Sequence, residues 1–212
     1  MNFLILGMLA LGGWFFLTGS NPTCLSFSPK GKKILFLGDS ISAGKGTAGG
    51  QLVALLRAAG AEVTVNALGG RSAASFVRGS RGLKEPEKGL LQLADSINDG
   101  IDTAIIFLGT NDLAGLAVGN TKEQTIKPFR AIVTQLRTAG VEVYGIGAPH
   151  YEKRPDLVGY EDGLREELED VYGRGRFLDA GPLTGNYYMH AGGAKAKDFA
   201  ARLFACLTGA TP

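Results

Sequence analysis

Lys33-Ile34-Leu35-Phe36-Leu37, followed directly by Gly38-Asp39-Ser40, is the stretch that decides the fold. Its apolar content is nearly continuous, which is typical of a strand buried on both faces of a parallel sheet. Gly38 and Asp39 are common turn residues, so Ser40 comes at the sharp turn where this strand ends. Ligands of open α/β sheets bind beyond the carboxyl ends of the strands. We therefore expect the Ser40 hydroxyl to face the crevice at that edge.

Four further apolar, strand-like runs alternate with segments of helical periodicity. Alternation of this kind predicts a parallel sheet covered by helices on both faces. The expected fold is an α/β, three-layer αβα sandwich of the flavodoxin-like kind with a five-stranded parallel sheet. The expected strands are 33–37, 62–68, 103–108, 141–145 and 176–178, and the expected helices are 51–59, 126–137, 161–171 and 194–207.

The composition indicates a globular chain. Its 212 residues are 45% apolar and 20% charged, which suits one domain with a full core. The net charge is +2 and the basic residues are scattered, so we expect no nucleic acid as a partner. The densest basic stretch, 71–88, also holds Glu85 and Glu87, and we expect it to be a solvated loop that leads into a helix, with a binding patch for an anionic substrate as the alternative.

The N-terminal segment differs from the rest of the chain. Phe3 to Leu17 is apolar apart from glycines, and the first charged residue is Lys30. A helix of about fifteen to eighteen residues extends roughly 22 to 27 Å, slightly less than the ~30 Å hydrocarbon layer of a bilayer. We therefore expect residues 1–20 to be a signal peptide or a membrane anchor, with attachment through residues 3–17. Residues 21–31 are expected to be a linker, and residues 32–208 the folded domain.

Two features bear on where the domain resides. Thr18-Gly19-Ser20 is a tolerable small-residue cleavage site, which favours export. Against this, no positive residue precedes the apolar run, and Lys30, Lys32 and Lys33 follow it. Positive charge after a membrane span favours keeping the segment that follows the span in the cytoplasm. We expect an exported (periplasmic or extracellular) or outward-displayed domain, with a cytoplasm-facing anchor as the alternative.

Cys24 and Cys206 are the chain's two cysteines. In an exported protein they could pair, because a segment just before the first strand can lie near a closing C-terminal helix. Alternatively they are two unpaired small hydrophobic residues, since Cys206 stands among apolar neighbours. Both alternatives remain open from the sequence.

Three later segments each supply a group that a reactive serine needs. The strand at 63–68 runs into Gly69-Gly70, where a backbone N–H can face the crevice. The strand at 103–108 ends in Gly109-Thr110-Asn111-Asp112, whose asparagine carries two amide donors. His190 precedes a small-residue turn and a helix-patterned tail, so a base arrives late in the chain.

Taken together, these residues resemble the SGNH (GDSL) hydrolase family of esterases and lipases, over about residues 33–205. The resemblance implies that Ser40 is the nucleophile and His190 its base. It also implies that Gly70 and Asn111 complete the oxyanion hole. It implies no metal and no cofactor.

Two other residues are alternatives for these roles. Gly69 adjoins Gly70, but the residues around Gly70 match the family pattern better. His150 is the other histidine of the chain, and we expect it to line the substrate cleft rather than to act as the base.

One position departs from the family pattern. Family members usually carry an aspartate three residues before the histidine, and here that residue is Tyr187. Disabling the carboxylate of a serine triad typically lowers turnover about 10⁴-fold. Asp179, a backbone carbonyl and Tyr187 itself are the candidates for orienting His190, and a Ser–His dyad is the alternative.

The expected activity is therefore that of a serine esterase that forms an acyl-serine intermediate. The expected partner is an ester-bearing small molecule or an acetylated cell-wall or surface polysaccharide, with lipid esters or thioesters as the alternative. A non-catalytic carbohydrate-binding or structural module is a further alternative, which Tyr187 supports. A phosphate loop is excluded, because Gly46 stands where the motif requires Ser or Thr after Lys45.

Overall fold

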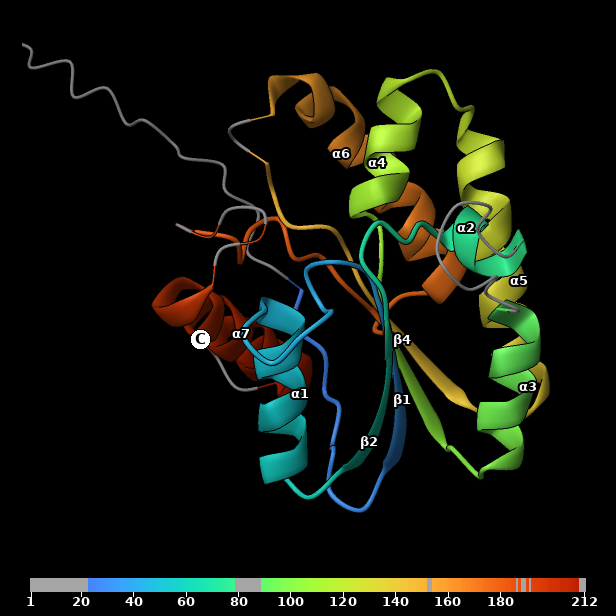
Figure 1. Cartoon of the computed structure of the whole chain (residues 1–212), viewed down its shortest axis with the longest axis vertical. Helices are drawn as coiled ribbons and strands as arrows, with labels where there is room; N and C mark the ends of the chain where they lie inside the picture. Colours follow the sequence, from blue (N-terminus) through green and yellow to red (C-terminus); the bar gives the residue numbers. More distant parts are fainter. Residues whose placement is uncertain are drawn as a thin grey trace, which may run out of the picture.

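A single parallel sheet forms the centre of the molecule (Figure 1). The structure, a computed structural model, describes residues 23–78, 89–151, 154–185, 187, 190 and 192–209. Five strands in this part of the chain lie in the order β2-β1-β3-β4-β5, and every neighbouring pair is parallel. The order is that of flavodoxin-like folds, so the predicted fold class is confirmed. The strands are β1 Lys33–Gly38, β2 Glu62–Ala67, β3 Thr103–Phe107, β4 Glu142–Ile146 and β5 Phe177–Leu178.

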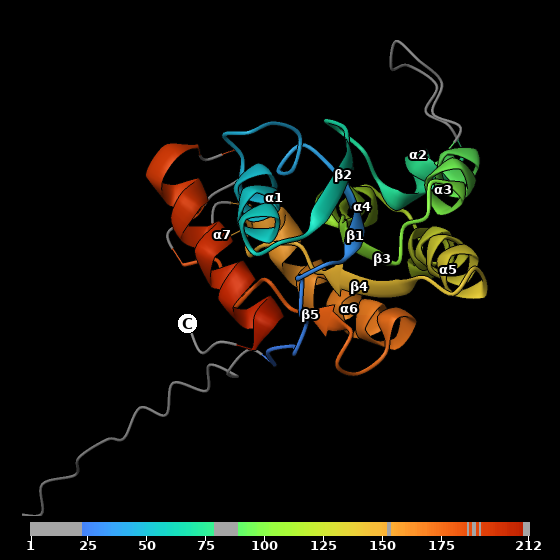
Figure 2. The same cartoon turned by 90° about the horizontal axis from the view of Figure 1, so that it is seen from below.

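Helices cover both faces of the sheet and complete three layers (Figure 2). Two of them pack on one face: α1 Ala48–Ala58 and α7 Gly193–Thr208. The other face carries α2 Ala73–Arg78, α3 Gly89–Asn98, α4 Thr110–Ala117, α5 Lys122–Thr138 and α6 Pro155–Tyr172.

The side chains of β1 explain why its sequence is apolar throughout. Successive side chains of a strand point to opposite faces. Ile34 and Phe36 enter the core beneath α1 and α7, whereas Leu35 and Leu37 enter the core on the opposite face. All four are at most 1% exposed. The strand therefore holds the two cores together, as the continuous apolar run predicted.

Local signals in the sequence set several helix ends. The Thr47 hydroxyl accepts a hydrogen bond from the Gly50 N–H and caps α1. Thr121 and Gln124 form a capping box at the start of α5. Gly60 and Gly140, with φ of +94° and +80°, follow the ends of α1 and α5, where a left-handed backbone favours glycine.

A disulfide joins the start of the described chain to α7. Cys24 and Cys206 are bonded, with an S–S distance of 1.97 Å, so the pairing that the sequence left open is formed. The Leu25 and Phe27 N–H groups donate to the carbonyl oxygens of Cys206 and Leu207 at 2.8 and 3.0 Å, and both side chains are buried. Part of the expected linker therefore packs against α7.

The expected signal or anchor, residues 1–20, lies outside the described residues. In the part of the chain that the structure does describe, no helix is both long and apolar enough to cross a bilayer.

Candidate functional site

The turn that carries Ser40 is fixed by its small and acidic neighbours. A Cβ on Gly38 would lie 2.4 Å from the Cβ of Ser42, so this close approach requires glycine. The Asp39 carboxylate accepts a hydrogen bond from the Ile41 N–H at 3.0 Å, and the Ser42 N–H donates to the Asp39 carbonyl at 3.1 Å. Ser40 is half-buried at the apex of this turn, beyond the carboxyl end of β1.

His190 lies beside Ser40. Its Nε2 is 2.8 Å from the Ser40 Oγ, although the two residues are 150 positions apart. This distance is within the range for direct proton transfer. His190 has a φ of 63°, the one positive value for a non-glycine among the described residues. A left-handed backbone costs about 1–2 kcal/mol in such a residue, so the surrounding loop must hold it there.

Asn111 lies in the first turn of α4 and reaches the loop after β2. Its Nδ2 donates to the carbonyl of Arg71 at 2.9 Å. Next to it, the Asp112 carboxylate accepts a hydrogen bond from the Ala73 N–H at 3.0 Å. These two bonds tie the end of β3 to the loop that contains Gly70.

The strand register places Ser40, Gly70 and Asn111 on neighbouring strand ends. Gly38 of β1 is paired with Ala67 of β2 and with Phe107 of β3, and each candidate follows its strand by a few residues. Gly70 has a φ of +76°, and no described atom outside its two chain neighbours lies within 4 Å of the position that a Cβ would occupy there. The N–H groups of Ser40 and Gly70 make no hydrogen bond to another described residue. Free donors therefore stand at the edge that carries the serine.

A buried layer of polar side chains lies beneath the turn. Asp39 is 0% exposed and Arg71 is 2% exposed. Arg71 donates to the carbonyl oxygen of Asn66 at 2.6 Å. The prediction of a solvated loop is therefore wrong at Arg71, because the guanidinium turns inward to satisfy backbone carbonyls at the ends of β1 and β2.

The electrostatics of this layer follow from burial. Desolvation raises the pKa of Asp39 to about 6, although the hydrogen bond from the Ile41 N–H and the charge of Arg71 oppose the shift. Desolvation also lowers the pKa of Arg71 to about 10, and Asp39 opposes that shift. Burial raises the pKa of Asp112 to about 7. Burial therefore brings the pKa values of two carboxyl groups, Asp39 and Asp112, close to neutral pH.

Neither proposed orienting side chain is bonded to His190. Asp179 accepts a hydrogen bond from the Gly181 N–H at 3.0 Å and lies 3.6 Å from Arg165. Tyr187 is 5% exposed, its ring stacks on Phe199 at 4.5 Å, and its hydroxyl has no hydrogen-bond partner among the described residues. Burial raises the pKa of Tyr187 to about 12. Among the described residues, the imidazole of His190 is hydrogen-bonded to Ser40.

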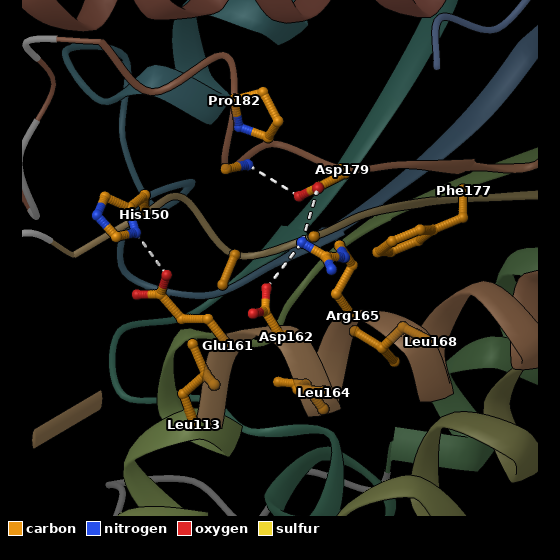
Figure 3. A pocket seen from close by; sticks show the side chains of 13 residues that line it. Leu113, His150, Glu161, Asp162, Leu164, Arg165, Leu168, Phe177, Asp179 and Pro182 are labelled. Carbon is orange, nitrogen blue, oxygen red and sulfur yellow. Dashed lines mark hydrogen bonds and ion pairs between the residues drawn. The ribbon is translucent and has the colours of Figure 1, made fainter. Parts of the chain in front are cut away.

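His150 lies in a different place from the serine and its base. It pairs with Glu161 at the mouth of a pocket of about 600 Å³, between α6 and the carboxyl ends of β4 and β5 (Figure 3). The sequence predicted that His150 lines a substrate cleft, and it does line a cavity. That cavity is not lined by Ser40 or His190.

A second cavity, of about 450 Å³, adjoins Asn111 between α2, α4 and α5. Its lining includes the polar residues Ser72, Asn120 and Gln124 and the apolar residues Ala74, Val77 and Ala131. Within the described ranges, no group of three or more His, Cys, Asp or Glu side chains could hold a metal ion.

Comparison with known proteins decides the family. The model of the GDSL-like lipase/acylhydrolase family matches residues 36–201. The chain belongs to this family. Its members hydrolyse esters, and the resemblance based on Ser40, Gly70, Asn111 and His190 is confirmed at the level of the family. The protein is an ester hydrolase.

Solved structures share the fold of this GDSL-family chain. An acetylxylan esterase from Geobacillus stearothermophilus is 18% identical, with a TM-score of 0.62 over 86% of this chain and 97% of that one. The aryl esterase of M. smegmatis is 20% identical, with a TM-score of 0.53 over 82% of this chain and 96% of that one. No curated protein sequence matches the chain.

Proposed function

We propose that the protein is a serine esterase that removes acetyl or short acyl groups through a covalent acyl-Ser40 intermediate. The observation that carries this proposal is the 2.8 Å approach of His190 Nε2 to Ser40 Oγ at the carboxyl edge of the sheet. A nucleophile within hydrogen-bond reach of a base is the arrangement that covalent catalysis requires.

The reaction begins when His190 accepts the Ser40 proton and Oγ attacks the ester carbonyl carbon. The tetrahedral intermediate collapses as His190 returns the proton to the departing alcohol oxygen. Water then repeats the attack on the acyl-serine, releases the acid and regenerates the Ser40 hydroxyl. Every proton passes through one imidazole nitrogen, Nε2.

The oxyanion that forms in each half-reaction needs donors on the opposite side of the carbonyl. We assign this role to the N–H groups of Ser40 and Gly70 and to the Asn111 side chain. The absence of hydrogen bonds from both N–H groups to other described residues supports the assignment. The bond from Asn111 to the Arg71 carbonyl supports it too, because it holds the amide beside the Gly70 loop.

His190 is proposed to act in a dyad. Asp179 is engaged by Arg165 and Gly181, and the Tyr187 hydroxyl is turned into the core. In place of a carboxylate, the buried ring of Tyr187 is proposed to anchor the loop that presents the imidazole. Its stacking on Phe199 of α7 supports this role.

We propose an O-acetylated polysaccharide of the cell wall or cell surface as the substrate. The structural likeness to acetylxylan esterases supports this choice, and so do the polar side chains among those that line the cavity beside Asn111. The Cys24–Cys206 disulfide supports an exported location, because disulfides persist in oxidising compartments. Residues 1–20 are proposed as the export signal or membrane anchor.

Hydrolysis of a small chromogenic acetate ester tests the activity. The wild-type chain is expected to turn over this ester, and Ser40→Ala and His190→Ala are each expected to abolish turnover. Ser28→Ala is the matched control, because Ser28 is an exposed serine in the segment before β1. Full activity of folded Ser40→Ala would show that Ser40 is not the nucleophile.

Chain-length preference tests the substrate. Acetate release from acetylated polysaccharide is compared with hydrolysis of esters of increasing acyl length. The proposal expects acetyl esters to be the best substrates. A preference for long acyl chains would instead support a lipid esterase or thioesterase.

A further inference from the structure

The pocket that contains His150 lies at the same edge of the sheet as Ser40, but beside different strands. It has a volume of about 600 Å³, within the range of small-ligand sites, and opens between α6 and the residues that follow β4 and β5 (Figure 3). The titratable side chains that line it are His150, Glu161, Asp162, Arg165 and Asp179.

One side of the pocket carries an imidazole in a fixed orientation. The His150 Nδ1 lies 2.5 Å from one carboxylate oxygen of Glu161, and the Tyr151 N–H donates to the other oxygen at 3.0 Å. The His150 N–H donates to the Thr184 hydroxyl at 2.8 Å. Both oxygens of Glu161 are therefore in use, whereas the Nε2 of His150 makes no hydrogen bond to another described residue.

The other side carries a guanidinium between two carboxylates, as Figure 3 shows. Arg165 lies 2.9 Å from Asp162 and 3.6 Å from Asp179. A guanidinium has five N–H donors, so these two contacts leave donors for a ligand. Their arrangement is set before a ligand arrives, which lowers the entropy cost of binding.

The charge and polarity of the lining restrict the ligand. Three carboxylates face one guanidinium, so the pocket repels phosphates and other anions. Its apolar members include Leu164, Leu168 and Phe177, whose side chains are 4%, 1% and 6% exposed. Carboxylate and imidazole acceptors together with guanidinium donors suit the hydroxyl groups of a neutral sugar or of an amino sugar.

The pocket is linked to the catalytic elements on two sides. Leu113 belongs to α4, the helix whose first turn carries Asn111. Tyr151, which follows His150, lies with its hydroxyl 2.7 Å from that of Thr110, the residue before Asn111. The pocket therefore adjoins the elements that hold Asn111.

We propose that this pocket is a second subsite, for a neutral or cationic sugar unit of the same glycan whose acetyl group is cleaved at Ser40. The inference rests on the proposed function and deepens it. It predicts that the enzyme favours long acetylated glycans over single acetylated sugars, and uncharged glycans over acidic ones.

The experiment compares three probes: acetylated xylo-oligosaccharides of increasing length, an acetylated galacturonan oligomer as the anionic arm, and a small chromogenic acetate. For the wild type, KM should fall as the xylo-oligosaccharide lengthens, and the galacturonan should be the poorer substrate. Arg165→Gln should raise KM for the long xylo-oligosaccharide about tenfold, the equivalent of about one charge-assisted hydrogen bond, without a matching rise for the small acetate.

Arg130→Gln is the matched control, because Arg130 is also an exposed, ion-paired helix residue but lies outside the pocket. If Arg165→Gln unfolds, His150→Ala replaces it, with the same expectation. Two results would overturn the subsite but not the proposed esterase activity. One is a wild type that hydrolyses the small acetate but shows no length dependence. The other is a set of variants whose KM values shift equally on both substrates. A wild type inactive on the small acetate would overturn the proposed function itself.

Discussion

At the scale of single residues, the catalytic proposal depends on how Ser40 and His190 are held. Gly38 and Asp39 shape the turn under the serine, and the sequence predicted both of them as turn residues. The placement of Tyr187 could not be predicted, because a loop position has no helix or strand periodicity from which its burial can be inferred. The burial of Arg71 was missed for a similar reason, since a cation in a polar stretch is ordinarily solvated.

The role of the Tyr187 ring can be separated from that of its hydroxyl. Tyr187→Phe keeps the stacking on Phe199 and removes a buried hydroxyl without a partner among the described residues, so activity and stability should remain close to wild type. Tyr187→Ala removes the ring and should cost about 3 kcal/mol of unfolding free energy and most of kcat. Denaturant unfolding and steady-state kinetics measure both quantities. Loss of activity in Tyr187→Phe would show that the hydroxyl, not the ring, supports His190.

Asn111 is expected to act mainly in the transition state. Asn111→Ala should lower kcat by about 10²–10³ with little change in KM, because one oxyanion donor is lost. Steady-state kinetics on a small acetate ester provides the measurement. A large rise in KM with unchanged kcat would assign Asn111 to ground-state binding instead.

At the scale of elements, the sequence predicted all five strands and the helices α1, α5, α6 and α7, with shifts of a few residues at their ends. A helix was expected directly after the stretch 71–88, without stated bounds, and α3 lies there. The helices α2 and α4 were not predicted. They span only Ala73–Arg78 and Thr110–Ala117, and helices this short depend on tertiary contacts rather than on their own periodicity. The start of α4 matters most, because it carries Asn111.

The close contact at the end of β1 gives a test at this scale. Gly38→Ala would drive a Cβ into Ser42, so the turn must shift, and both stability and activity should fall. Gly46→Ala is the matched control in the same loop, because nothing lies within 4 Å of its Cβ position and its φ is not positive. Thermal melting and ester hydrolysis report the two effects. Equal behaviour of the two variants would contradict the packing argument.

At the scale of the whole molecule, the N-terminal segment and α7 close the fold through the disulfide. The sequence left this pairing open, because it depends on how far apart two chain ends lie in space. Breaking the bond, which links residues 182 positions apart, should cost about 3–5 kcal/mol of stability. Denaturant unfolding of Cys206→Ala, or of the reduced wild type, measures this loss. Unchanged stability in both would show that the link contributes little.

The buried carboxyl groups predict an unusual pH dependence. Burial holds the pKa of Asp112 at about 7, far above its value in an unfolded chain. The folded chain therefore binds more protons than the unfolded chain between about pH 4 and 7, so stability should fall as pH rises through this range. Asp112→Asn keeps an acceptor for the Ala73 N–H and should flatten the decline. Melting temperatures across this range test it, and an unchanged slope in Asp112→Asn would contradict the assignment.

Covalent labelling tests the central claim most directly. The chain is treated with a fluorophosphonate, which mimics the tetrahedral intermediate, and the modified peptide is identified by mass spectrometry. The account predicts a single adduct on Ser40 in the wild type and its near-complete loss in folded His190→Ala. An adduct on another residue, or labelling of Ser40 that does not depend on His190, would contradict it.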